Sequence, residues 1–81
     1  MKSIVNAQLV ERVLTKLGAA TPEGWIGSRN LLHGQVIERG HDCAPNTVAR
    51  IVLILIHSGR LTTEALRTGK YRFRLVGGER A

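Results

Sequence analysis

The chain has 81 residues with a net charge of +6, and 43% of its residues are hydrophobic. This length allows one small domain, and the hydrophobic fraction argues against a disordered chain. The longest apolar run, Ile51–Ile56, is far shorter than the roughly 20 residues that span a bilayer. One cysteine, Cys43, cannot form an internal disulfide. We therefore expect a soluble, cytoplasmic protein with no membrane partner, associated with the nucleoid if the source is prokaryotic.

The positive charge is concentrated in the second part of the chain. Residues 1–45 carry five bases and four acids, whereas residues 46–81 carry seven bases and two acids. Clustered cations attract polyanions through steering and counterion release, although a basic domain can also be merely soluble. The charge distribution thus indicates a nucleic-acid partner without establishing one.

The first helix is predicted over residues 3–17, with Ser3 as the N-cap and Gly18 directly after its end. Its apolar residues recur at helical spacing: Leu9, Val10, Val13, Leu14 and Leu17. In the glycine-flanked loop that follows, Trp25 and Ile26 predict a very short strand. We expect Trp25 to fill the core, since a lone tryptophan in a small domain usually packs.

The second helix is predicted over residues 28–39, with Ser28 as the N-cap and Gly40 just after its end. The candidate backbone contacts at its start are Ser28, Arg29 and Asn30. Backbone N–H groups, the helix dipole and the arginine charge can together hold a phosphate there. Plain capping of the helix by Ser28 is an equally open interpretation.

The third helix is predicted over residues 45–58, because Pro45 suits a first helical turn and Gly59 a helix end. Its inward stripe follows the i, i+3, i+4, i+7 spacing: Val48, Ile51, Val52 and Leu55. The candidate base-contacting residues on the outer face are Asn46, Thr47 and Arg50. Asparagine pairs with adenine, arginine pairs with guanine, and threonine contacts a base edge or a thymine methyl.

The run Ile51–Ile56 is apolar at every position, so every face of those helical turns is apolar. Either the helix is sandwiched between the other elements, or part of it contacts a second copy. We favour a homodimer contact formed by Leu53, Ile54 and Ile56. A two-fold pair also suits a protein that reads DNA half-sites.

A β-hairpin is predicted over residues 59–76, with its turn at Arg67–Lys70. In its second strand Tyr71, Phe73 and Leu75 alternate with three cations: Lys70, Arg72 and Arg74. The apolar face is expected to cover the core. The cationic face suits phosphates or an A·T-rich minor groove, and it also protects an edge strand from unwanted pairing.

This order of elements resembles the winged helix-turn-helix superfamily. The closest local similarity is the segment Pro45–Ile51, followed by Leu55, Gly59 and Arg60–Leu61. The resemblance implies an α+β winged helix over residues 1–76, with a two-stranded wing, possible pairing of the short first strand, and a flexible tail at 77–81. It implies base contacts by the outer face of the third helix and backbone contacts by the wing.

The leading hypothesis is therefore a small sequence-specific transcriptional regulator that binds double-stranded DNA. The alternatives are a winged helix that binds a protein partner through the apolar patch, and an RNA-binding domain, which the lack of exposed wing aromatics disfavours. His41, Asp42 and Cys43 are too closely spaced for a standard zinc site, and a redox role of Cys43 is also disfavoured. No catalytic motif is present, so we expect neither an enzyme nor a cofactor.

Overall fold

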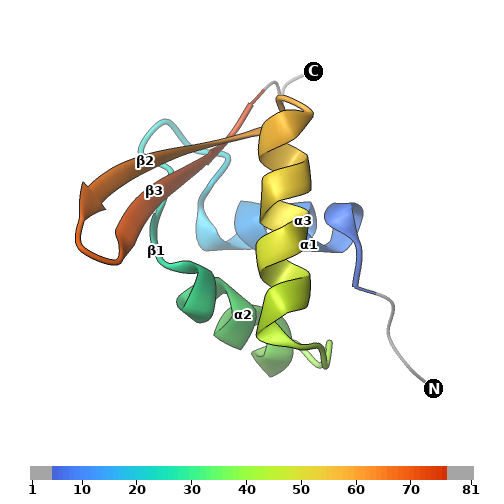
Figure 1. Cartoon of the computed structure of the whole chain (residues 1–81). Helices are drawn as coiled ribbons and strands as arrows, with labels where there is room; N and C mark the ends of the chain where they lie inside the picture. The colour runs from blue at the N-terminus through green and yellow to red at the C-terminus, as the bar shows by residue number, and fades with distance from the viewer. Residues whose placement is uncertain (1–4, 77–81) are drawn as a thin grey trace.

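The computed structural model describes residues 5–76, which form three helices and one three-stranded antiparallel sheet (Figure 1). In chain order the elements are α1 (Ala7–Leu17), β1 (Trp25–Gly27), α2 (Arg29–Glu38), α3 (Pro45–His57), β2 (Leu61–Arg67) and β3 (Lys70–Leu75). The expected α+β class and the short first strand are confirmed. The tail expected at 77–81 lies outside the described residues. Within residues 5–76, no helix has the length and apolarity needed to cross a membrane.

The start of α1 differs from the sequence prediction. Asn6 has an extended backbone, with φ −136°, and its side chain accepts a hydrogen bond from the Leu9 N–H at 3.0 Å. Asn6 is therefore the N-cap, and the helix begins at Ala7, later than the start at residue 3 that we predicted. Ser3, the N-cap expected from the sequence, lies outside the described residues. The other end is confirmed, since Gly18 caps the helix with φ +105°.

Strand β3 occupies the centre of the sheet, with β1 on one side and β2 on the other. The register places Phe73 between Trp25 of β1 and Thr63 of β2. The ring centroids of Trp25 and Phe73 lie 5.4 Å apart, and Trp25 packs against the core as expected. The predicted hairpin is therefore the larger part of a sheet that β1 completes.

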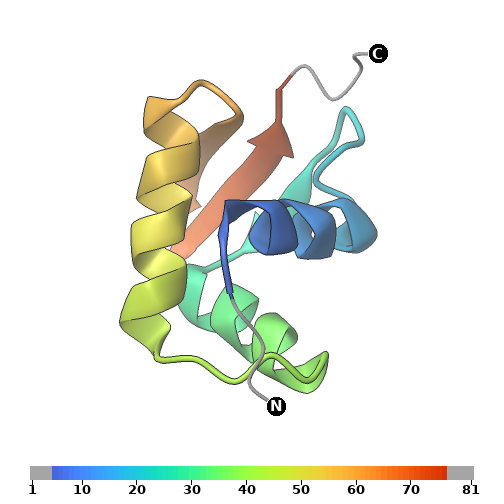
Figure 2. The same ribbon diagram turned by 90° about the vertical axis from the view of Figure 1, so that its right-hand side faces the viewer.

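The core lies between the helices and the inner face of the sheet (Figure 2). Helix α3 contacts α1, α2 and β2, so it is the central helix of the packing. The fully buried large side chains come from all three helices and from both long strands: Val10, Leu14, Leu32, Val36, Val48, Val52, Leu55, Leu61 and Phe73. The core stripe predicted for the third helix is thereby confirmed, and that of the first helix is confirmed at Val10, Val13 and Leu14, whereas Leu9 and Leu17 are half-buried. In β3, Phe73 is buried, and Tyr71 and Leu75 are half-buried against the core.

Gly24 precedes β1 at a point where the chain approaches β3 closely. Its φ is +70°, and a Cβ added there would lie 2.6 Å from the backbone oxygen of Phe73. We expect Gly24→Ala to destabilise the fold by more than the roughly 1–2 kcal/mol that a positive φ alone costs. Gly40→Ala is the matched control, because its φ is +90° and its Cβ would meet nothing within 4 Å. Urea denaturation measures both losses, and equal losses would contradict the close approach.

Candidate nucleic-acid interface

The N-terminal turns of α3 expose the polar residues that the sequence singled out. Pro45 is the first residue of α3, and its N-cap, Ala44, makes no side-chain hydrogen bond. Asn46 and Arg50 are exposed, whereas Thr47 is half-buried. Of the three candidate base-contacting residues, two are thus exposed and one is half-buried.

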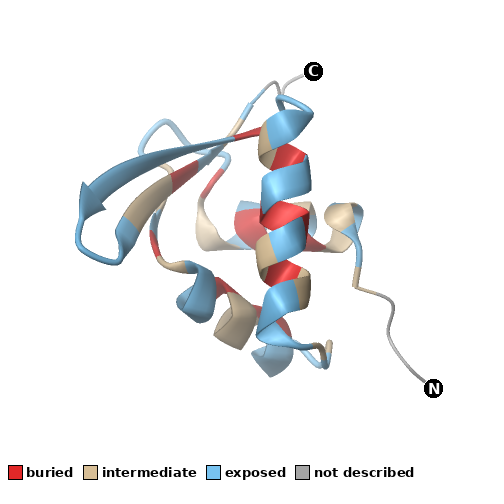
Figure 3. Cartoon of the chain, in the orientation of Figure 1, coloured by how far each residue is buried: buried red, intermediate tan, exposed pale blue. Residues whose placement is uncertain are grey.

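The C-terminal half of α3 has one buried side and one exposed side (Figure 3). Leu53 and Ile54 are 46% and 52% exposed, which excludes the alternative that this half is sandwiched on every side. Ile56 differs from them, because it is half-buried and packs against the core. The expected contact surface of three apolar residues is therefore reduced to Leu53 and Ile54, and Ile56 belongs mainly to the domain's own packing.

The exposed polar and apolar residues of α3 lie on a single face. Successive residues of an α-helix are rotated by about 100°, which places Asn46, Arg50 and Leu53 within a sector of about 60°. His57 falls inside this sector, and Ile54 lies about 40° beyond it. A shallow, mostly apolar hollow on this face is lined by Arg50, Leu53, Ile54, His57 and Ser58. We call the surface formed by Asn46, Arg50, Leu53, Ile54 and His57 the α3 face.

The three cations of β3 are not equivalent. Lys70 and Arg74 are exposed, and neither has an ion pair within residues 5–76. Arg72 is half-buried: its Nη1 donates to the carbonyl oxygen of Glu23 at 3.2 Å, and its Nε lies 3.6 Å from a carboxylate oxygen of Glu64. Lys70 and Arg74 are thus available to a ligand, while Arg72 partly holds the loop before β1 against the sheet.

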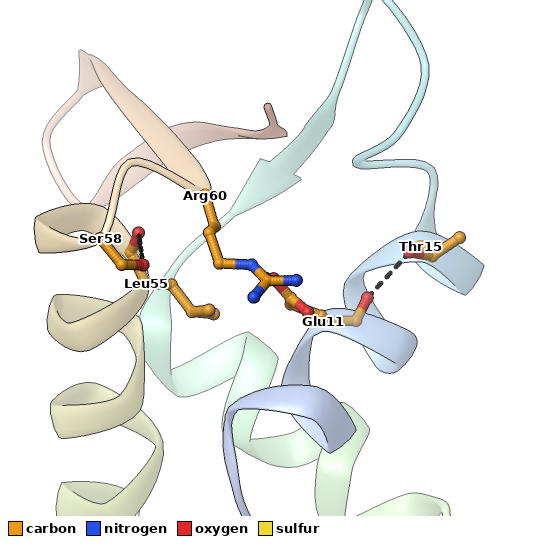
Figure 4. Close-up of polar contacts among 5 residues, drawn as sticks. All are labelled: Glu11, Thr15, Leu55, Ser58 and Arg60. Atoms are coloured by element: carbon orange, nitrogen blue, oxygen red, sulfur yellow. Dashed lines mark hydrogen bonds and ion pairs between the residues drawn. The ribbon is translucent and has the colours of Figure 1, made fainter. Parts of the chain in front are cut away.

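Arg60, which contributes to the basic charge of the second half of the chain, is paired in the folded domain. Its Nε lies 2.7 Å from a carboxylate oxygen of Glu11 on α1 (Figure 4). Near this ion pair, the Ser58 hydroxyl donates to the carbonyl oxygen of Leu55 at the end of α3. The sequence carries no local signal for the pair, because its two residues are far apart in the chain.

The start of α2 is capped by a side chain that was also a candidate phosphate contact. The Ser28 hydroxyl accepts a hydrogen bond from the Leu31 N–H at 3.1 Å, which is plain N-capping. Arg29 and Asn30 are exposed beside it. Ser28 therefore has a structural role in the fold, and Arg29 and Asn30 are the accessible side chains at this helix start.

The turn between α2 and α3 contains His41, Asp42 and Cys43. Among the described residues, no group of three potential ligands is placed to hold a metal ion. Burial, followed by the nearby Asp42 carboxylate, raises the pKa of the Cys43 thiol. A raised pKa disfavours the reactive thiolate that a redox switch requires. The carbonyl oxygen of Cys43 lies 2.7 Å from Nε2 of His33, so this turn is fastened to α2.

The fold and the site together define a small α+β domain that exposes a helix face without acidic residues, next to a hairpin with accessible cations. No protein-family model matches the chain, and no curated protein matches it significantly.

Proposed function

We propose that this protein is a winged-helix domain that binds double-stranded DNA and acts as a transcriptional regulator. The order of its elements supports the winged-helix assignment, since two helices precede α3 and a two-stranded hairpin follows it. In this proposal α3 enters the major groove and the hairpin contacts the backbone or the minor groove.

The observation that carries the proposal is the chemistry of the α3 face. Asn46 and Arg50 are exposed on its first turns, and no acidic residue belongs to α3. The exposed Lys70 and Arg74 lie on the hairpin that projects beside this helix (Figure 1). Hydrogen-bonding side chains for base edges are thereby combined with cations for phosphates, as duplex recognition requires.

The first experiment is a fluorescence-anisotropy titration of a random-sequence DNA duplex at low and at moderate salt. A polyelectrolyte contact weakens steeply as salt rises, because phosphate neutralisation releases condensed counterions. We expect binding at low salt with such a dependence, which would justify selecting a specific site. Absence of binding at low salt would reject the proposal.

The wing makes a separate prediction. Replacing Lys70 and Arg74 by alanine should reduce the slope of log affinity against log salt concentration by about 0.9 for each phosphate that the variant no longer neutralises. The matched control is Arg12→Gln/Lys16→Gln, which removes the same charge from exposed positions of α1. The same anisotropy titration measures both slopes. An equal reduction in both variants would assign the effect to total charge and exclude the wing from the phosphate-binding surface.

A second candidate function is favoured by Leu53 and Ile54, two adjacent aliphatic residues of α3 that the fold leaves 46% and 52% exposed. In this function the α3 face binds a protein partner or a second copy of the chain. Because Leu53 shares its face with Asn46 and Arg50, a dimer formed through α3 would cover the proposed base-contacting residues. DNA binding and α3-mediated dimerisation are therefore alternatives, and a dimer that reads two half-sites would need another contact surface.

A further inference from the structure

A second hollow lies between α1 and the turn that follows α2. It has a volume of about 330 Å³ and is lined by Leu9, Arg12, Val13, Lys16, Arg39 and His41. Its volume is at the lower end of the range for small-molecule sites. None of its lining residues belongs to α3 or to the hairpin, so this hollow is distinct from the proposed DNA interface.

The hollow combines apolar and cationic groups. Val13 is buried and Leu9 is half-buried, while Arg12 and Lys16 are exposed on the same helix. Among residues 5–76, no acidic side chain lines the hollow, and neither Arg12 nor Lys16 has an ion pair. A ligand that fits this chemistry has an apolar body and an anionic head.

Two polar residues, Arg39 and His41, line the hollow from the side of the turn that follows α2. Arg39 is held in place because its Nη1 donates to Gln35 Oε1 at 2.6 Å and lies 3.3 Å from the Gln35 carbonyl oxygen. Nδ1 of His41 is buried and has no hydrogen-bond partner among the described residues. Because that nitrogen has almost no exposed surface, a ligand in the hollow does not reach it while the imidazole keeps this orientation, and Arg39 is the group on this side that can meet the anionic head.

We propose that this hollow is a binding site for a small organic anion, with the apolar body against Leu9 and Val13 and the carboxylate between Arg12, Lys16 and Arg39. The chemistry of the ligand class follows from the lining. Charge-assisted hydrogen bonds to arginine and lysine hold the head, and burial against two aliphatic side chains retains the body. The proposal does not depend on DNA binding.

Three probes test the site: benzoate, its neutral analogue of nearly the same shape, benzamide, and the small anion acetate. Acetate has the head without the ring, and benzamide has the ring without the charge. Titrations followed by backbone amide NMR shifts should show saturable benzoate binding at α1 and at residues 39–41. We expect acetate and benzamide to bind at least about tenfold more weakly, since each lacks one of the two contributions.

Variants separate a built site from general attraction of anions. Arg12→Gln/Lys16→Gln should weaken benzoate binding by at least about tenfold, because neither side chain can then donate a charge-assisted hydrogen bond. Arg67→Gln/Arg74→Gln removes the same charge from the exposed hairpin and should leave benzoate binding unchanged. The proposal is overturned if benzoate does not bind, if acetate or inorganic phosphate binds as tightly, or if the hairpin variant weakens binding equally.

Discussion

Replacing Phe73 by alanine should destabilise the domain by about 3–5 kcal/mol, the range found for deleting a buried phenylalanine. Phe73 is 1% exposed and lies on the central strand. The centroid of its ring lies 5.4 Å from that of the Trp25 ring and 6.4 Å from that of the Tyr71 ring. The substitution removes the side chain that joins β1 to the rest of the core. For a small domain this loss is a large part of the total stability.

Urea denaturation followed by helical circular dichroism and Trp25 fluorescence measures this loss. Arg74→Ala is the matched control, because Arg74 is on the same strand but on the exposed face. It should change the stability by less than about 0.5 kcal/mol. Phe73→Leu retains much of the apolar volume and gives a measurable value if the alanine variant does not fold. Equal stabilities of the Phe73→Ala and Arg74→Ala variants would contradict the assigned core.

Arg50→Ala should weaken binding to a selected DNA site by about 1–3 kcal/mol, which is roughly fivefold to 150-fold in affinity. Arg50 is exposed on the α3 face, where its guanidinium can donate two hydrogen bonds to guanine. Removal of a base contact should also relax the sequence preference at one position of the site. Competition titrations with the selected duplex and with its single-base variants measure both effects.

Arg12→Ala is the matched control for Arg50→Ala, since it removes the same charge from the exposed side of α1. It should weaken binding to specific and random duplexes by the same small factor. Retained specific affinity in Arg50→Ala would end the assignment of Arg50 as a base reader. Leu53→Ala tests the second candidate function. If the α3 face binds a protein partner, the Leu53→Ala variant should lose that partner, and the Arg12→Ala variant should retain it.

Local sequence patterns predicted most of the secondary structure because they depend on neighbouring residues only. The spacing of Val48, Ile51, Val52 and Leu55 identified the buried stripe of α3, and all four are buried. The alternation in residues 70–75 identified the inner and outer faces of β3. The predicted start of α1 was the main error. Both Ser3 and Asn6 are suitable N-caps by residue type, and the hydrogen bond from the Leu9 N–H to the Asn6 side chain identifies Asn6 as the cap.

Only the tertiary structure decided which residues of these patterns are buried and which contact one another. An all-apolar run has no periodicity that distinguishes a buried side, so packing alone left Leu53 and Ile54 exposed while Ile56 joined the core. The alternation of charge in β3 likewise could not show that Arg72 is held by Glu23 and Glu64 while its two neighbouring cations are accessible.

The sequence by itself thus determined the elements, their inward faces and the excess of cations in the chain's second half, because short-range periodicity and composition encode these properties. The tertiary structure decided the pairing of Trp25 with Phe73, the ion pair of Glu11 with Arg60, and the hollow shared by α1 and His41. These contacts join residues far apart in the chain, and their geometry depends on how the helices and the sheet pack around one core.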